Sequence, residues 1–325
     1  MRILLQHLLE NFFGEVLGLD EGSVTGELDH DTQRQLRIQS TQIGSFTTTQ
    51  IGAFSATNLS ALDATQTSGL TTTQITSLTS TQLTGLNGTD VQDLSTTQLG
   101  ALTQTQLSSL TPTSFSALGD TQVQALSTTQ LRGLTTAQIG GLTTTDVTEF
   151  TATQIGSLAT TQLAAFGATN LGALTDTQVA GLTTTQIASL SATNLSALNA
   201  SQIADLSTTQ VGALTTTQLG GLSTTDFAEL NSTQIDAFSQ TQIGALSVTN
   251  FASLDQPTVQ SLTTTQLKGL TTAQIAAFST TDANELADTQ LASLTTTQVA
   301  AFNVTNFSAF DATQVGGLTT TQISS

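Results

Sequence analysis

The strongest constraint on the fold is an eight-residue repeat that runs from residue 39 to the end of the sequence. Residues 71–78 read TTTQITSL, and residues 79–86 read TSTQLTGL. With Leu or Phe placed at position 8, the chain holds 35 full octads and one truncated octad, without insertions. Repetition at a fixed short period is typical of stacked arrays, so the repeat predicts a solenoid.

The pattern inside the octad separates three possible structures. Position 5 is nearly always Ile, Leu, Val or Phe, with Thr67 and Ala283 as departures, and position 4 is mostly Gln. A strand would place positions 5 and 8 on opposite faces of a sheet. A continuous helix would rotate its apolar stripe by about 80° per octad, so no face would stay buried. One short helix per octad avoids both conflicts.

Helix start signals favour the short helix. Position 1 is almost always Ser, Thr, Asn, Asp or Gly, which are residues that cap helix N-termini. Gln at position 4 completes the Ser/Thr-x-x-Gln capping box, and the preceding Leu and position 5 form the hydrophobic staple. Leu78, Thr79, Gln82 and Leu83 show all of these features together. Small residues at positions 6 and 7 allow neighbouring helices to approach closely.

The predicted fold class is therefore all-α: a superhelical solenoid of about 36 eight-residue short-helix repeats. A β-solenoid is the alternative, favoured by the high Thr content and the even period. Residues 39–325 form the octad solenoid, and residues 1–38 form a small helical N-terminal cap.

A second period is visible where position 4 departs from Gln. Leaving out Thr258, whose octad contains Pro257, successive departures lie 24 or 32 residues apart, which is three or four octads. The mean spacing predicts about 3.4 to 3.5 octads per turn, and thus about ten coils in a rod on the order of 100 Å long. The departures are Asn58, Asp90, Ser114, Asp146, Asn170, Asn194, Asp226, Asn250, Asp282 and Asn306.

The residues of this stripe are the candidate functional residues. Asn58, Asn170, Asn194, Asn250 and Asn306 are the predicted interaction stripe, along which copies of the chain would associate. The four octads with Asp at position 4 pair acids three residues apart, which places them on one helix face. Such oxygen ligands suit Ca²⁺, and the alternative is a solvated or capping acidic edge. The candidate calcium ligands are Asp90 with Asp93, Asp146 with Glu149, Asp226 with Glu229, and Asp282 with Glu285.

Charge excludes several classes of partner. The net charge is -18 with five Lys and Arg residues, and after residue 39 the basic side chains are Arg132 and Lys268. Nucleic-acid binding needs cations against phosphate, so no nucleic-acid partner is expected. No apolar run reaches the roughly 20 residues of a membrane-spanning helix. The sequence has no catalytic motif and both His residues precede the octads, so we expect no enzyme activity and no cofactor.

Two segments resemble known families. RILLQHLL and VTGELDHDTQRQL in residues 1–39 resemble the peptidoglycan-binding-like helical domain, although Thr25 and Ile38 depart from its pattern. The matching residues are Leu5, Gln6, Leu9, Val24, Gly26, Leu28, Thr32, Leu36 and Gln39. The octads resemble the TTxQ[IVL]xxL repeats of large secreted or surface adhesin-like bacterial proteins.

These resemblances imply an extracellular or cell-surface protein, with cell-wall or glycan contact through residues 1–38. The leading functional hypothesis is a non-enzymatic structural rod, which would act as a spacer or filament subunit and could self-assemble. One alternative is an adhesin or cell-wall-binding module. Another is an ice-binding protein, although Thr residues that cap helices would have part of their hydrogen-bonding capacity already used.

Overall fold

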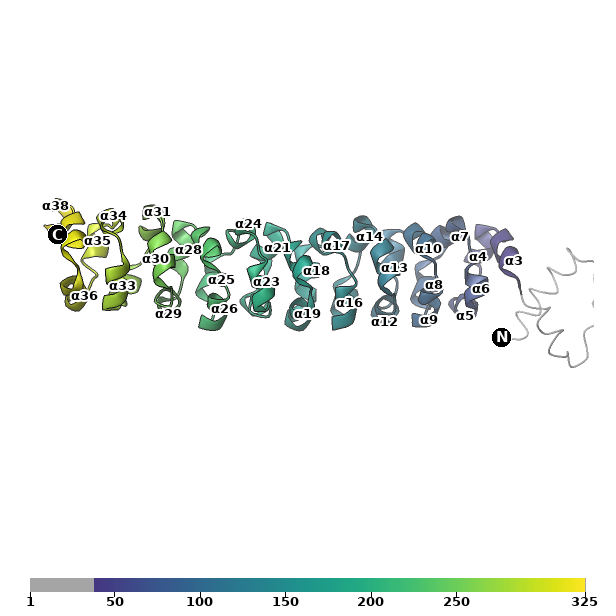
Figure 1. Ribbon diagram of the computed structural model, residues 1–325. Helices are drawn as coiled ribbons and strands as arrows, with labels where there is room; N and C mark the ends of the chain where they lie inside the picture. Colours follow the sequence, from purple (N-terminus) through teal and green to yellow (C-terminus); the bar gives the residue numbers. More distant parts are fainter. Residues whose placement is uncertain (1–37, 325) are drawn as a thin grey trace, which may run out of the picture.

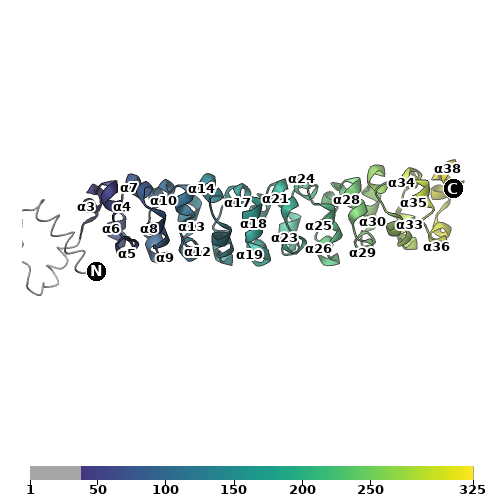
Figure 2. The same cartoon turned by 180° about the vertical axis from the view of Figure 1, so that it is seen from behind.

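The computed structural model describes residues 38–324 as one elongated rod of short helices. Figure 1 shows coil following coil along the rod, and Figure 2 shows the same arrangement from behind. The described residues contain 36 helices and no strands, which confirms the all-α solenoid and excludes the β-solenoid. The predicted cap of residues 1–38 lies outside the described residues, apart from Ile38.

Each octad contributes one helix of four to seven residues. The helices are α3 (Ser40–Ser45), α4 (Thr48–Gly52), α5 (Ala56–Ser60), α6 (Ala64–Thr67), α7 (Thr72–Ser77), α8 (Ser80–Thr84), α9 (Gly88–Gln92), α10 (Thr96–Ala101), α11 (Gln104–Leu107), α12 (Pro112–Ser116), α13 (Asp120–Ala125), α14 (Thr128–Arg132), α15 (Thr136–Gly140), α16 (Thr144–Thr148), α17 (Ala152–Ser157), α18 (Thr160–Ala165), α19 (Gly167–Ala173), α20 (Asp176–Ala180), α21 (Thr184–Ser189), α22 (Ala192–Leu195), α23 (Ala200–Ala204), α24 (Thr208–Val211), α25 (Thr216–Gly220), α26 (Thr224–Ala228), α27 (Ser232–Asp236), α28 (Gln240–Ala245), α29 (Val248–Phe251), α30 (Gln256–Ser261), α31 (Thr264–Leu267), α32 (Thr272–Ala276), α33 (Thr280–Glu285), α34 (Asp288–Ser293), α35 (Thr296–Val299), α36 (Val304–Ala309), α37 (Ala312–Gly317) and α38 (Thr320–Ile323).

The helix starts follow the predicted capping chemistry. In α8 the Gln82 N–H donates to Thr79 Oγ1 at 3.3 Å, and the Thr79 N–H donates to Gln82 Oε1 at 2.8 Å. Leu78 and Leu83, the staple pair, are 5% and 0% exposed. Since the first and last turns of any helix leave backbone groups without partners, a helix this short depends on its caps and on packing.

One octad departs from the predicted start. Helix α19 begins at Gly167, which occupies position 1, and not at the residue after it. Gly167 has no side chain to accept a capping hydrogen bond, and its φ of 68° lies in the left-handed region, which glycine adopts without steric cost. The chain therefore enters this helix through a left-handed residue in place of a capped turn.

The coil number follows from two sets of contacts. Most helices pack against the helix three places further on, as α15 does on α18 and α34 does on α37. Most helices are also hydrogen-bonded to the helix four places back: Gln138 of α15 donates to Leu107 and Leu110 carbonyl oxygens in the octad of α11. A coil therefore contains between three and four helices, as the second sequence period predicted.

Positions 5 and 8 form one continuous core along the rod, and almost all of them are buried. The small residues at position 7 face position 2 of the octad three places earlier. A Cβ added to Gly269 would lie 2.0 Å from the Gln240 carbonyl oxygen, and one added to Gly181 would lie 2.8 Å from Ala152 Cβ. The coils therefore approach to backbone contact, which confirms the predicted role of small side chains at this position.

Candidate functional site: the polar stripe along one edge of the rod

The stripe predicted from position 4 is a real edge of the molecule. Its ten residues belong to α5, α9, α12, α16, α19, α22, α26, α29, α33 and α36. The members labelled in Figure 1 follow the lower edge of the rod, and those labelled in Figure 2 keep to that edge. The sequence-predicted residues, separated by 24 or 32 positions in the chain, are thus brought into one line.

Octads with Gln at position 4, called ordinary octads below, form a hydrogen-bonded bridge between coils that the stripe octads lack in full. In α14 the Gln130 side chain accepts the Ser127 N–H at 2.9 Å, and its amide nitrogen donates to the carbonyl oxygens of Leu99 and Leu102 at 2.9 and 2.8 Å. One side chain therefore caps its own helix N-terminus and bonds the last carbonyls of the helix four places back. From Gln66 onward every position-4 Gln donates to the position-8 carbonyl in this way.

Three of the five Asn residues in the stripe retain half of this bridge. Asn170, Asn250 and Asn306 donate to the carbonyl oxygens of Leu142, Leu222 and Phe278 at 2.8, 3.0 and 2.7 Å. These are the same position-8 carbonyls that Gln uses. The side chain is one methylene shorter, and in these octads it forms no capping box with its own helix.

Three of the four Asp residues in the stripe reverse the direction of the bridge. A carboxylate has no N–H to donate, so the Asp instead accepts a hydroxyl from position 6 of the octad four places back. Ser60 donates to Asp90 at 2.5 Å, Ser196 donates to Asp226 at 2.7 Å, and Ser116 donates to Asp146. In each case the same carboxylate also accepts the N–H of its own N-cap residue.

These hydrogen bonds affect the acidity of Asp226. Burial acts to raise the pKa of this carboxyl group, but the hydrogen bonds from Ser196 and Ser223 outweigh it and hold the pKa below its ordinary value. The environment of Asp226 therefore stabilises its ionised form.

The second acid of each pair, at position 7, has a different environment. Glu149 and Glu285 each have an Oε2 atom that is buried without a hydrogen-bond partner. Burial, followed by the neighbouring carboxyl groups of Asp120 and Asp146, raises the pKa of Glu149 to about 7. Burial and the charge of the position-4 acid also raise the pKa of Glu229 and of Glu285.

The structure explains a charge pattern that the sequence analysis missed. The chain has 23 acidic residues, of which seven precede residue 39. The other sixteen all belong either to a stripe octad or to the octad that follows it. Stripe octads hold Asp90, Asp93, Asp146, Glu149, Asp226, Glu229, Asp282 and Glu285, and the following octads hold Asp63, Asp120, Asp176, Asp205, Asp236, Asp255, Asp288 and Asp311.

This partition gives the rod two kinds of surface. In the described part of the chain, acids occur only in stripe octads and in octads that directly follow them, and the remaining octads expose Thr, Ser, Gln, small side chains, Arg132 and Lys268. The sequence alone contains this partition of the acids. It can be found by assigning each acidic residue to its octad and comparing the position of that octad with the 3.5-octad period. Its meaning depends on knowing that neighbouring octads lie side by side at one corner of a coil.

The predicted calcium sites are not assembled as clusters. Within residues 38–324, no three His, Cys, Asp or Glu side chains come together in a way that could hold a metal ion. The position-4 carboxylates are occupied as helix caps and as acceptors of Ser hydroxyls, as Asp90 and Asp226 show. This arrangement leaves a pair of acids, one of them already engaged, where Ca²⁺ takes six or more oxygen ligands.

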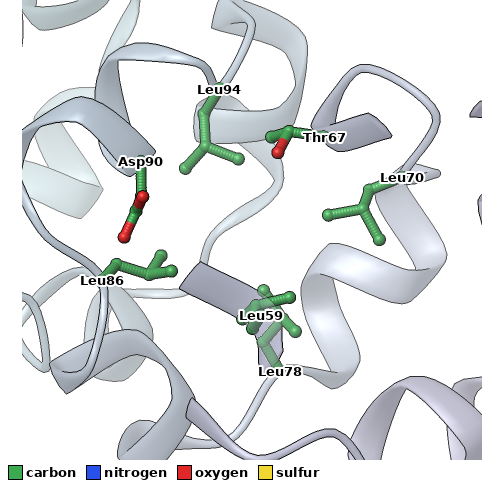
Figure 3. Close-up of a pocket in the computed structure, with 7 residues that line it drawn as sticks. All are labelled: Leu59, Thr67, Leu70, Leu78, Leu86, Asp90 and Leu94. Carbon is green, nitrogen blue, oxygen red and sulfur yellow. The ribbon is translucent and has the colours of Figure 1, made fainter. Parts of the chain in front are cut away.

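A small gap in the core lies beside the stripe. It has a volume of about 10 Å³, room for about one water molecule. Figure 3 shows the Asp90 carboxylate and the Thr67 hydroxyl among the Leu side chains that line it. Thr67 replaces the aliphatic residue usual at position 5, so the gap is a packing defect.

No helix in the described region is long and apolar enough to cross a membrane.

The fold and the stripe together define a helical repeat protein of the solenoid class. Residues 115–152, 123–160, 155–192 and 193–224 match the ALTTAQ repeat family, and all of these stretches lie within the octads. The octads are thus similar to an established family of repeats. Nothing among curated proteins or solved structures matches the chain significantly.

Proposed function

We propose that this protein is a non-enzymatic structural rod, which serves as a spacer or filament subunit outside the cell or at its surface. The observation that carries the proposal is the Gln bridge repeated along the rod. It bonds each coil to the coil before it, alongside an apolar core that continues from coil to coil. Such a molecule gains length by adding equivalent units, and each unit contacts only its near neighbours.

The rod can be tested by its length. Negative-stain images of the full chain should show particles on the order of 100 Å long, since about ten coils stack at roughly 10 Å each. A variant that lacks residues 127–182 loses seven octads, or two turns, and keeps the stripe in register. Its particles should be shorter by about a fifth. Globular particles, or a length that the deletion leaves unchanged, would refute the proposal.

Self-association is the second part of the proposal, and the charge pattern limits how it occurs. The stripe was predicted as the contact line, but the sixteen acids on that edge repel one another when two edges meet. Because salt screens exposed charges with a Debye length of about 10 Å at 0.1 M, association along the stripe should strengthen as salt is added. Sedimentation at several salt concentrations measures this. Association that weakens with salt would show that another surface forms the contact.

The cellular location also belongs to the proposal and derives from the resemblance of the octads to surface-protein repeats. Fractionation of cells that express the full chain should find it in the medium or on the surface. Binding of the full chain to purified peptidoglycan, compared with a variant that lacks residues 1–38, tests the cell-wall contact separately. Equal retention of the two forms would remove residues 1–38 as the contact.

A further inference from the structure

The last described coil, formed by α36, α37 and α38, exposes apolar side chains that are buried in the rest of the rod. Its position-5 residues Phe307, Val315 and Ile323 are 41%, 44% and 65% exposed. From Ile43 to Val299, by contrast, every position-5 residue is buried. This end of the rod therefore presents a face that, between coils, is covered by the next coil.

The opposite end, formed by α3, α4 and α5, exposes the other apolar position of the octad. Phe46, Phe54 and Leu62 at position 8 pack against the core but are only partly buried. In Figure 1 the labels of α36 and α38 lie at the end with the C-terminus, and those of α3 to α5 lie at the other end. One end thus presents position 5 and the other presents position 8, the two positions that form the core together.

The first coil also carries unused hydrogen-bond donors. In an ordinary octad the position-4 amide nitrogen donates to the octad four places back, as Gln130 does to Leu102. The side-chain amide nitrogens of Gln42, Gln50 and Asn58 form no hydrogen bond among the described residues. These three donors belong to α3, α4 and α5, next to the partly exposed position-8 side chains.

The last coils supply the matching acceptors. The position-8 carbonyl oxygens of Phe302, Phe310 and Leu318 accept no hydrogen bond within residues 38–324. In the interior these carbonyl oxygens are the ones that accept the Gln amide, as Leu294 accepts from Gln322 at 2.7 Å. Three donors at one end and three acceptors at the other are therefore the two halves of the bridge that joins coils inside the rod.

Charge also favours contact at the ends over contact along the stripe. Residues 39–62 contain no charged side chain, and residues 303–324 contain Asp311 alone. Two stripe edges would bring acids against acids, whereas the two end faces carry almost no charge to repel one another.

We propose that copies of this chain associate end to end, with α36–α38 of one copy packed against α3–α5 of the next. The proposal rests on the self-association proposed above and assigns to it a contact at the ends of the rod. The contact repeats the seam between coils, with position 5 against position 8 and amide donors against carbonyl oxygens. Because the two faces differ, the interface is heterologous, and successive additions along the rod produce an open filament.

Particle length tests the contact, because side-by-side association adds width to the particles and end-to-end association adds length. Negative-stain images of the full chain at rising concentration should show rods at multiples of the single length. Ile323→Glu places a carboxylate on the face of α36–α38. Gln50→Glu keeps the oxygen that caps Thr47 but replaces the amide donor with a carboxylate. Each should weaken association by more than about tenfold, since the contact would bury an ionised group without a partner.

A mixture of the two variants distinguishes the proposed contact from others. Ile323→Glu retains an intact first coil and Gln50→Glu retains an intact last coil. An equal mixture should therefore form rods of twice the single length and no longer, although neither variant does so alone. Val304→Glu is the matched control, because Val304 is 83% exposed at position 2 of α36 and lies outside the position-5 face. It should form long rods as wild type does.

Several outcomes would overturn the proposal. Long rods in Gln50→Glu alone would mean that α36–α38 packs on a second last coil or on residues 1–37 of another copy. Loss of long rods in Val304→Glu would mean that any added acid prevents association. Rods of the single length in wild type at every concentration would reject the end contact and leave the structural rod intact as a proposal. Globular particles would reject both.

Discussion

Octads with Gln at position 4 and octads of the stripe have the same length and the same core positions, but they connect the coils differently. Gln130 caps its own helix and donates two hydrogen bonds to the helix four places back. Asn250 donates one such bond, and Asp226 donates none and accepts from Ser196. The comparison shows that side-chain length and donor capacity at a single position decide how strongly one side of the coil is bonded to the next.

The largest effect should come from removing a complete bridge. Gln130→Ala removes the acceptor of the Ser127 N–H and the donor to two buried carbonyl groups, Leu99 and Leu102. Since each hydrogen bond lost from a buried group costs about 1–3 kcal/mol, we expect the free energy of unfolding to fall by about 2–4 kcal/mol. Urea denaturation measures this change in the free energy of unfolding.

The control for this change is Gln130→Glu, which keeps the acceptor for the cap and loses the two donated bonds. Because it also places a carboxylate against two carbonyl oxygens, its cost is an upper limit for the contribution of the contacts between coils. If the Ala variant is as stable as wild type, the bridge does not stabilise the coils and the contrast between the two kinds of octad has no energetic basis.

A slightly smaller effect should follow from changing the distance between coils. Gly269→Ala places a Cβ 2.0 Å from the Gln240 carbonyl oxygen, so α31 and α28 must separate. Overpacking of this kind costs about 1–3 kcal/mol. Gly52→Ala in α4 is the matched variant, because nothing lies within 4 Å of its added Cβ, and it should stabilise by about 0.5–1 kcal/mol. Thermal unfolding of the two variants should shift in opposite directions; shifts of equal sign would argue against backbone contact at position 7.

The stripe itself can be converted toward an ordinary octad. In Asn250→Gln the longer side chain can reach the Ser247 N–H and also the carbonyl oxygen of Leu219, and it keeps the bond to Leu222. We expect the free energy of unfolding to rise by about 1 kcal/mol for the net gain in hydrogen bonds. Chemical denaturation compares it with Asn250→Ala, which should be destabilised. A destabilised Gln variant would mean that the coils lie too close at the stripe for the longer side chain.

The smallest effect should come from the reversed bridge. Ser196→Ala removes a hydroxyl donor from Asp226 near the surface, which should cost about 0.5–1 kcal/mol. The pKa of Asp226 should rise toward its ordinary value of 3.8. In wild type this acid contributes stability above 3.8 that is lost as the pH falls through its lowered pKa, so the variant should lose stability at a higher pH than wild type does.

NMR titration of Asp226 in the two proteins checks the shift in its pKa. Asp282 provides an internal comparison, because the octad four places back from it has Ala252 at the position that corresponds to Ser196. An unchanged titration of Asp226 in Ser196→Ala would show that the hydroxyl does not determine the acidity of this carboxyl group.

Much of the fold could be predicted because its determinants lie close together in the chain. The capping box joins residues three apart, and the staple joins residues five apart, as Thr79 with Gln82 and Leu78 with Leu83 show. The coil number could be predicted as well, because substitutions at position 4 recur at the spacing of the coil. Gly167 could not be placed correctly, since a glycine at position 1 permits either a capped turn or a left-handed residue.

For the candidate site, the sequence predicted which residues form the stripe but not the surroundings of those residues. The sequence located the stripe residues, but it gave no reason to distinguish Glu149 from Glu229, which occupy the same octad position. Their difference lies in residues 29 positions earlier, Asp120 and Ala200. The sequence also suggested calcium from paired acids, without showing that Asp90 and Asp226 are already engaged as caps and as acceptors of Ser hydroxyls.

The sequence by itself determined the short helix, its capped start, its buried positions and the number of octads per coil. All of these depend on contacts within one octad or on a period that can be counted. The tertiary structure decided which coil each Gln bonds, how closely position 7 approaches its neighbour, and which acid faces which. Those contacts join residues 28 to 31 positions apart, and they are set by the stacking of whole coils, which no single octad contains.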